Sequence, residues 1–250
     1  MADQKKGMSD LWRRLRFVFL AIVVYRMGTH IPIPGIDPAR LAALFDQNQG
    51  TILEMFNLFS GGALERMSIF ALNVVPYISA AIIMQLFSNS IPYLKELKKD
   101  GQAGRNQITQ FTRYGTVVLA FVQASALSVT LGASGLAYEP GASFFISAVF
   151  SVVAGTIFLM WLGEQITERG IGNGISIIIA TSILTGIPGA IGQALEQARQ
   201  GDLNILLLLG IGVLAMLVIA IVVFIERGQR RITVNYAQRQ QGRKLMQAQA

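Results

Sequence analysis

Few residue types in this sequence could carry out chemistry, and their spacing argues against catalysis. No cysteine is present, which excludes disulfides, thiolate metal sites and cysteine nucleophiles. His30 is the one histidine, so a two-histidine metal site is excluded, and no nucleophile motif lies near it for an intramembrane serine protease. Glu164 and Glu168 have the spacing of one helix face, but Arg169 follows at once. A solvated helix end explains these two carboxylates better than an acid–base pair.

The glycine-rich turn at 170–174, GIGNG, is only faintly similar to a nucleotide-binding loop. In the GxGxxG pattern a third glycine would fall at position 175, which is isoleucine, and no strand–helix–strand unit surrounds the turn. A simple turn, or glycines that let helices pack closely, explains it. The sequence therefore predicts a protein that is not an enzyme and that holds no cofactor and no metal.

The elements that must position any functional residue are membrane helices, because the composition is wrong for a soluble domain. Hydrophobic residues make up 52% of the 250 residues and charged residues 14%, with a mean hydropathy of +0.50. Soluble domains carry about 25% charged residues. A helix needs about 20 predominantly apolar residues to cross a bilayer; five stretches meet that need, and a weaker sixth contains Arg26 and His30. The predicted fold class is an all-α, polytopic membrane protein.

The predicted organisation alternates these helices with loops. Membrane helices are expected at 17–33, 70–92, 115–132, 143–163, 175–192 and 203–225, cytoplasmic segments at 1–16, 93–114, 164–174 and 226–250, and an external loop at 34–69. In that loop, 51–64 has an apolar run too short to cross a membrane, and Thr51 with Glu54 forms a capping box at its start. The pattern leaves a surface helix and a re-entrant segment equally open. Because the sequence stops in a charged segment, we expect the chain to be part of a longer one.

The distribution of basic residues predicts the topology. Of the 21 lysines and arginines, 17 fall on one side of the expected membrane, three on the other, and Arg26 lies within the first helix. Lysine and arginine concentrate in cytoplasmic loops, so we expect six crossings with both ends in the cytoplasm. An arginine at membrane depth is costly, and Arg26 has two open explanations: a functional or interhelical pairing, or a side chain that snorkels to the surface.

Polar residues interrupt the expected helix at 70–92, namely Asn73, Pro76, Ser79 and Gln85. Pro76 predicts a kink because it removes a backbone hydrogen bond. Such a kink is tolerated in a membrane helix only where protein or water donates a hydrogen bond to the freed carbonyl. Val74 and Ile78 are four residues apart and share a helix face, as do Ile175 and Ile179. By pattern alone, these four aliphatic residues would face lipid.

The cytoplasmic tail is strongly basic. Residues 227–244 contain six basic residues, the aromatic residue Tyr236 and no acid. Such a segment suits a phosphate backbone or anionic lipid, and its affinity would fall with salt. An ordinary positive-inside anchor is the alternative, although six charges exceed what orientation requires.

Several long segments carry a resemblance to a known family. They are IPIPGID at 31–37, GTILEMFNLFSGGAL at 50–64, PYISA at 76–80, QFTRYGT at 110–116, WLGEQITERGIGNGIS at 161–176 and ERGQRRITVNYAQRQQG at 226–242. In these segments the chain resembles the SecY family, the central subunits of the bacterial protein translocase, and most of all its proteobacterial members. The resemblance implies a clamshell of two pseudo-symmetric five-helix halves around an hourglass pore. This chain would supply the first half, the sixth helix and part of the following cytoplasmic loop.

The resemblance also implies roles for particular residues. The plug, a re-entrant half-helix that seats in the pore from outside, would lie at 56–64 and include Phe56, Asn57, Phe59, Ser60, Gly61 and Gly62. The pore ring would include Val74, Ile78, Ile175 and Ile179, with Val74 in place of the usual isoleucine. The lateral gate would include Ile82 and Gln85. Contacts with the ribosome or SecA would involve Arg105, Arg230, Arg231, Arg243 and Lys244. For the ring residues, the resemblance replaces the lipid-facing interpretation.

The implied function is a protein-conducting channel that moves unfolded secretory proteins across the bacterial inner membrane and releases hydrophobic segments into it. The expected partners are SecE, SecG, SecA, the ribosome (RNA and proteins at its exit tunnel), the nascent or signal-sequence-bearing polypeptide and the phospholipid bilayer. Two rival functions stay open. A secondary transporter for a small solute is disfavoured because the later helices carry no charge. A membrane-anchored scaffold that binds ribosomes would account for the basic loops but not for a plug or a ring.

Overall fold

The computed structural model describes residues 2–47, 57, 60–139, 141–200, 205–228, 240–241 and 244–245. The chain divides into two compact units, Met1–Ala190 and Ile191–Ala250, and each is described by itself. Within the described residues, the secondary structure is helical apart from one short hairpin and two single-pair β-bridges. The predicted all-α class is therefore confirmed, with the hairpin as a small addition.

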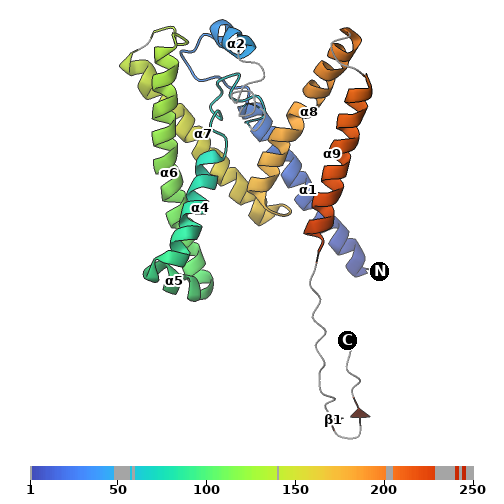
Figure 1. The fold of residues 1–250 in the computed structure, drawn as a ribbon. Coiled ribbons are helices and arrows are strands. Elements are labelled where there is room, and N and C mark those ends of the chain that lie inside the picture. The colour runs from blue at the N-terminus through green and yellow to red at the C-terminus, as the bar shows by residue number, and fades with distance from the viewer. Residues whose placement is uncertain are drawn as a thin grey trace. The chain divides into compact units, whose positions relative to one another are not determined.

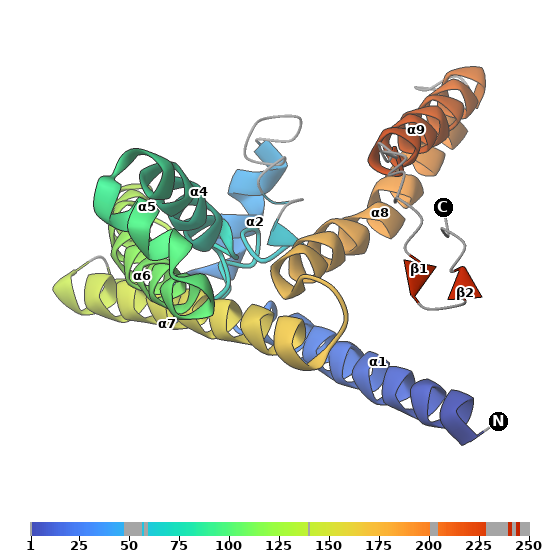
Figure 2. The same cartoon turned by 90° about the horizontal axis from the view of Figure 1, so that it is seen from below.

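The first unit is an assembly of helices. Its elements are α1 (Ala2–Gly28), α2 (Pro38–Gln47), α4 (Val75–Ser90), α5 (Pro92–Lys99), α6 (Gly101–Ala133), α7 (Ala142–Arg169) and most of α8 (Gly174–Gln200), shown in Figure 1. Helix α6 packs against α4, α5 and α7, and α1 packs against α7, as Figure 2 shows from below. The second unit holds the end of α8, α9 (Ile205–Glu226), and the antiparallel pair β1 (Gln240–Gln241) and β2 (Lys244–Leu245).

Four helices among the described residues are long and apolar enough to cross a membrane, judged by length and composition. They are Gly101–Ala133, Ala142–Arg169, Gly174–Glu196 and Leu209–Glu226. The two other predicted crossings differ from expectation: α1 runs from Ala2 to Gly28, and α4 has only 16 residues. At 1.5 Å per residue, α4 would be about 24 Å long, short of a ~30 Å hydrocarbon core. The six crossings therefore stay a prediction.

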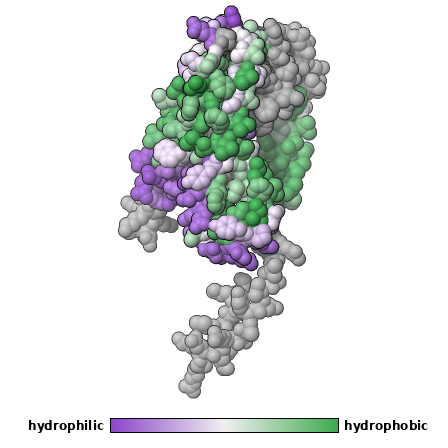
Figure 3. All heavy atoms as spheres, turned by 90° about the vertical axis from the view of Figure 1, so that its left-hand side faces the viewer, coloured by the Kyte–Doolittle hydropathy of each residue, from purple (hydrophilic) through white to green (hydrophobic). Residues whose placement is uncertain are grey.

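The outer surface of the first unit suits a lipid environment. Apolar side chains cover the middle of the face shown in Figure 3, and hydrophilic side chains gather towards its ends. Large apolar residues on this unit are exposed, for example Phe121 at 50% and Phe150 at 64%. Exposed apolar surface on this scale is unfavourable in water, and a surrounding bilayer accounts for it.

The start of α4 corrects one prediction. The helix expected from residue 70 begins at Val75, and Pro76 stands in its first turn, so the predicted kink is wrong. The first helical N–H groups have no partner within a helix, so a proline there removes nothing and its fixed φ suits the helix. Residues 61–74 before it form successive turns, in which Met67 and Asn73 adopt positive φ angles of 41° and 50°.

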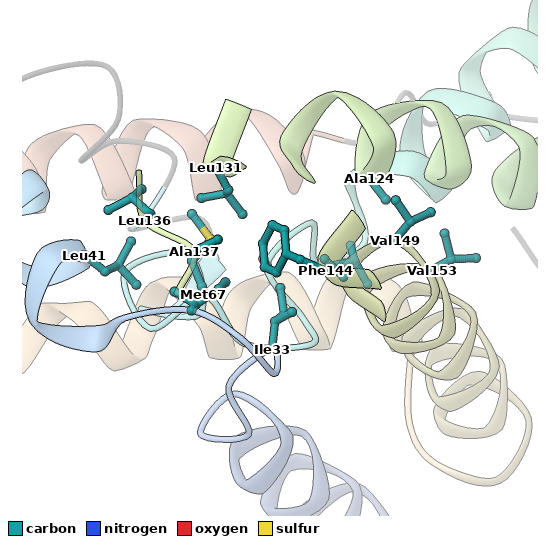
Figure 4. Packing of buried hydrophobic residues seen from close by; sticks show 14 of the residues in the cluster. Ile33, Leu41, Met67, Ala124, Leu131, Leu136, Ala137, Phe144, Val149 and Val153 are labelled. Atoms are coloured by element: carbon teal, nitrogen blue, oxygen red, sulfur yellow. The ribbon is translucent and has the colours of Figure 1, made fainter. Parts of the chain in front are cut away.

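A short helix that was not predicted, α2, lies in the loop that the sequence predicts to be external. The Asp37 carboxylate accepts hydrogen bonds from the backbone N–H groups of Ala39 (2.9 Å) and Arg40 (3.4 Å), which caps the helix. Its residue Leu41 packs into the core shown in Figure 4, where Ile33, Met67 and Phe144 meet. This core ties the loops before α4 to α6 and α7.

Small residues allow α6 to approach its neighbours closely. Thr116, Ala120, Ala124 and Ser128 lie four residues apart along α6 and are all buried. Small side chains at this spacing let membrane helices pack with their backbones close together, where dispersion contacts and hydrogen bonds hold them. On α7, Gly155 has the same role, because its α-carbon faces the backbone of Ile69 and the ring of Phe70.

Candidate functional site

The four predicted ring residues lie in one apolar cluster. Val74 immediately precedes α4, and the backbone N–H of Ile78 donates to the Val74 carbonyl at 3.0 Å, so the two side chains occupy successive turns. Val74 is 2% exposed and belongs to the cluster, and Ile78, Ile175 and Ile179 pack against it. None of the four is among the exposed large apolar residues. The structure thus brings together residues that are about 100 positions apart in sequence.

A local cap fixes the start of α8, the helix that carries the predicted ring residues Ile175 and Ile179. The Asn173 side-chain carbonyl accepts hydrogen bonds from the N–H groups of Ile175 (3.0 Å) and Ser176 (3.3 Å). Asparagine favours such capping positions because its short side chain reaches the unpaired N–H groups of the helix start. The Ile175 side chain packs over Gly163 of α7, where a larger residue would collide with it. The GIGNG turn is therefore a structural connection between α7 and α8.

The described part of the predicted plug comprises residue 57 and residues 60–64, and together with Glu65 we call it the plug segment. Phe56 and Phe59 lie outside the described residues, whereas Asn57 and Ser60 have helical conformation. The Asn57 side chain donates to the Glu65 carboxylate and accepts from the Glu65 N–H, both at 3.0 Å. Gly61 and Gly62 follow with positive φ angles of 66° and 79°, which glycine adopts without steric penalty. The segment is thus a compact hydrogen-bonded turn.

The plug segment is in direct contact with α1 and α8. The Tyr25 hydroxyl lies 3.3 Å from the Ser60 carbonyl oxygen and 2.5 Å from the Ser182 hydroxyl. The guanidinium of Arg26 donates to the Gly61 carbonyl at 3.2 Å. Of the two explanations left open for Arg26, pairing with another segment is the one that the structure supports.

Tyr25, Asn73 and Ser182 were not identified as site residues from sequence. The Asn73 amide donates to the Ser182 hydroxyl at 3.2 Å, and all three residues are buried, at 1%, 4% and 0% exposure. Tyr25 and Ser182 are separated by 157 positions, so no local spacing relates them. The signal available in the sequence was a polar residue, Asn73, inside an apolar stretch beside a predicted ring residue.

The predicted lateral-gate residues lie on the exposed side of α4. Ile82 is 53% exposed, and Gln85 is exposed and lines a hollow of about 370 Å³ between α4, α5 and α6. Arg105 lines the same hollow from α6. Ile78, Ile82 and Gln85 have i, i+4, i+7 spacing, so they form one stripe along α4.

Only two of the basic residues expected to contact a ribosome or SecA belong to the described part of the chain. Arg230, Arg231 and Arg243 lie outside it. Lys244 stands in β2 and pairs with Gln241 of β1. Arg105 is exposed on α6. No group of three or more metal-ligating side chains occurs in the part of the chain that the structure describes.

The comparison with protein families identifies the chain. The family model described as SecY matches residues 68–249. The chain belongs to the SecY family. It is 65% identical over 243 residues to the protein translocase subunit SecY of Pseudomonas aeruginosa, a match that covers 97% of this chain and 55% of that protein. It is 58% identical over 250 residues to the SecY protein of Escherichia coli (strain K12), and that match covers 98% of this chain and 56% of that protein.

This SecY-family chain spans about half the length of those two relatives, and 70% of a SecY protein from Buchnera aphidicola with 59% identity. Among solved structures, it resembles Sec61 in the canine ribosome-channel complex from the endoplasmic reticulum, with a TM-score of 0.62 and 20% identity over 90% of this chain and 50% of that one. A second solved structure, that of a protein conducting channel, has a TM-score of 0.55 and 20% identity. The match covers 78% of this chain and 43% of that one. These two likenesses confirm the fold.

Proposed function

We propose that this chain forms the first half of a protein-conducting channel in the bacterial inner membrane. The channel would move unfolded secretory proteins across the membrane and release hydrophobic segments sideways into lipid. One observation carries this proposal: the predicted plug segment lies against the same apolar cluster that holds the four predicted ring residues, with Ala63 of the plug segment fully buried in it.

A narrow collar of aliphatic side chains would seal such a channel against ions. Val74, Ile78, Ile175 and Ile179 offer no group that replaces the hydration shell of an ion, and hydrophobic constrictions exclude ions by dewetting. Because aliphatic side chains demand no hydrogen-bond pattern, they would part around a polypeptide of any sequence. The remaining ring residues would come from helices beyond this chain.

The remaining parts of the proposal follow from family membership and charge. SecE and SecG would complete the membrane complex, and a ribosome or SecA would drive transport from the cytoplasmic side, where both chain ends are expected. The fold shared with Sec61, which was solved in a ribosome-channel complex, supports the ribosome as a partner. Arg105 and the basic tail, including Arg230, Arg231, Arg243 and Lys244, would meet these partners, and a segment leaving through the lateral gate would pass Ile82 and Gln85.

Ion conductance at rest tests the channel and its ring. The intact SecY-family protein, assembled with its partners in planar lipid bilayers, would carry Ile78→Gly or Ile179→Gly. Each change opens the collar, so we expect ion leakage through the resting channel and acceptance of defective signal sequences. Ile183→Gly is the matched control, since Ile183 lies one turn further along α8 and is 38% exposed. Conductance in the ring variants equal to that of the control would overturn the proposal.

A further inference from the structure

The structure contains a buried polar network between the plug segment and two helices. Tyr25 of α1 and Ser182 of α8 are within hydrogen-bond distance of each other, and Tyr25 also reaches the Ser60 carbonyl. Asn73, directly before the ring residue Val74, donates to Ser182. We propose that Tyr25, Asn73 and Ser182 form a latch that holds the plug segment against α8 and so sets how readily the pore opens. This inference rests on the proposed channel function.

The protons of the network can be assigned. Each hydroxyl has one proton, and each hydroxyl oxygen can also accept. To serve the Ser60 carbonyl, Tyr25 must donate to it, Ser182 must donate to Tyr25, and Asn73 then donates to Ser182. Each hydroxyl proton in this chain is used once, and the last acceptor belongs to the plug segment. The closed position of the plug therefore completes the network.

The same network has a second arrangement for the open plug. The Ser182 hydroxyl also lies 2.9 Å from the carbonyl oxygen of Ile178, one turn earlier in α8. If the plug segment leaves, Tyr25 can turn its proton to Ser182, and Ser182 can donate to Ile178. No buried hydroxyl is then left without an acceptor. A buried hydroxyl without an acceptor would cost about 1–3 kcal/mol. The latch thus favours the closed position without making the opening prohibitive.

The backbone fit adds to this hold. A β-carbon on Gly61 would lie 3.1 Å from both the α-carbon and the carbonyl oxygen of Ser182, so the plug segment rests directly on the α8 backbone. A β-carbon on Gly62 would meet nothing within 4 Å, although its φ angle is similarly positive. Arg26 adds a second hydrogen bond from α1, to the carbonyl next to that of Ser60.

Amide hydrogen exchange of the intact protein in lipid nanodiscs tests the latch without requiring transport. In Tyr25→Phe, the ring stacked on Phe70 at 6.0 Å is kept and one oxygen is lost. Ser182→Ala removes the central hydroxyl. We expect the amides of 60–65 to exchange about threefold to tenfold faster in Tyr25→Phe, because opening becomes easier by the hydrogen bond to Ser60 that this variant loses. In Ser182→Ala we expect exchange no faster than in the parent, because the Tyr25 hydroxyl still donates to Ser60 and has lost its alternative acceptor. Thr185→Val is the matched control, since the Thr185 hydroxyl bonds only within α8, to the Thr181 carbonyl, in the contacts described.

Two further readouts separate a latch from general destabilisation. The double variant Tyr25→Phe with Ser182→Ala should exchange about as fast as Tyr25→Phe alone, since the Tyr25 hydroxyl makes the link to Ser60. Exchange in α7, around 148–160, should not change. Gly61→Ala should accelerate exchange of the plug segment well beyond Gly62→Ala, which shares the positive φ angle. Faster exchange in Ser182→Ala than in the parent, equal acceleration in α7, or equal effects of the two glycine variants would overturn the latch.

Resting conductance of the same variants links the latch to the pore. We expect resting channels of Tyr25→Phe to leak more often than those of Thr185→Val, and channels of Ser182→Ala to leak no more often than that control. Faster exchange with unchanged conductance would overturn the latch as a control of the pore, whereas the channel itself is decided by the Ile78→Gly and Ile179→Gly variants. The two proposals can therefore fail separately.

Discussion

Replacing Gly155 by alanine tests the close packing between α7 and the turns that precede α4. A β-carbon at this position would overlap the Ile69 carbonyl oxygen and lie 3.1 Å from the Phe70 ring. The oxygen belongs to the backbone and cannot turn away, so the turn or the helix must shift. Overpacking of this kind costs about 1–3 kcal/mol. Alanine in a helix interior gains about 0.5–1 kcal/mol over glycine, so we expect a net loss of up to about 2.5 kcal/mol.

Gly115→Ala is the matched control for this experiment. Gly115 also lies inside a long helix, α6, but a β-carbon there would be 3.6 Å from the Ala80 β-carbon, an ordinary contact. The control should therefore be neutral or more stable than the parent by up to about 1 kcal/mol. The free energy of unfolding would be measured by denaturant titration in mixed micelles with the same protein preparation. Equal stability changes in the two variants would refute the packing described for Gly155.

Two further predictions concern single contacts of the first unit. Asp37→Ala should destabilise the start of α2 by about 1 kcal/mol and accelerate amide exchange at 39–41, whereas Asp37→Asn should retain most of the cap; equal exchange in both variants would contradict the capping role. Arg113 donates to Glu164 at 2.7 Å, with side chains 42% and 17% exposed, so a double-mutant cycle should give a coupling energy of at most about 1 kcal/mol. A coupling energy well above about 1 kcal/mol would contradict the assignment of a partly solvated pair.

The sequence predicted the helical class because this class depends on composition and run length, which are local. It misplaced the start of α4, since Pro76 is compatible with a kink or with a first turn. The choice depends on the turns at 61–74, which no helical period encodes. The α2 cap could have been found, because Asp37 followed by Pro38 is a typical helix start.

The candidate site also has features that the sequence predicted and features that it could not predict. Periodicity placed Val74 with Ile78 and Ile175 with Ile179 on shared faces, but assigned them to lipid, and the family resemblance was needed to expect a ring. Tyr25 and Ser182 meet only through tertiary packing of α1 and α8, so sequence spacing could not relate them. Arg26 could be singled out because a charge in an apolar stretch requires a partner, but its partner, the Gly61 carbonyl, could not be named.

Site-specific photo-crosslinking to a translocating polypeptide tests the central claim most directly. A photoreactive amino acid would replace Ile78 or Ile179 in the intact protein, with Phe150, exposed on α7, as the control position. With a secretory polypeptide arrested during transport, positions 78 and 179 should cross-link to the polypeptide, and position 150 should cross-link to lipid. Cross-links to lipid alone at 78 and 179, or equal polypeptide cross-linking at 150, would contradict the proposal that these aliphatic residues line the polypeptide's path.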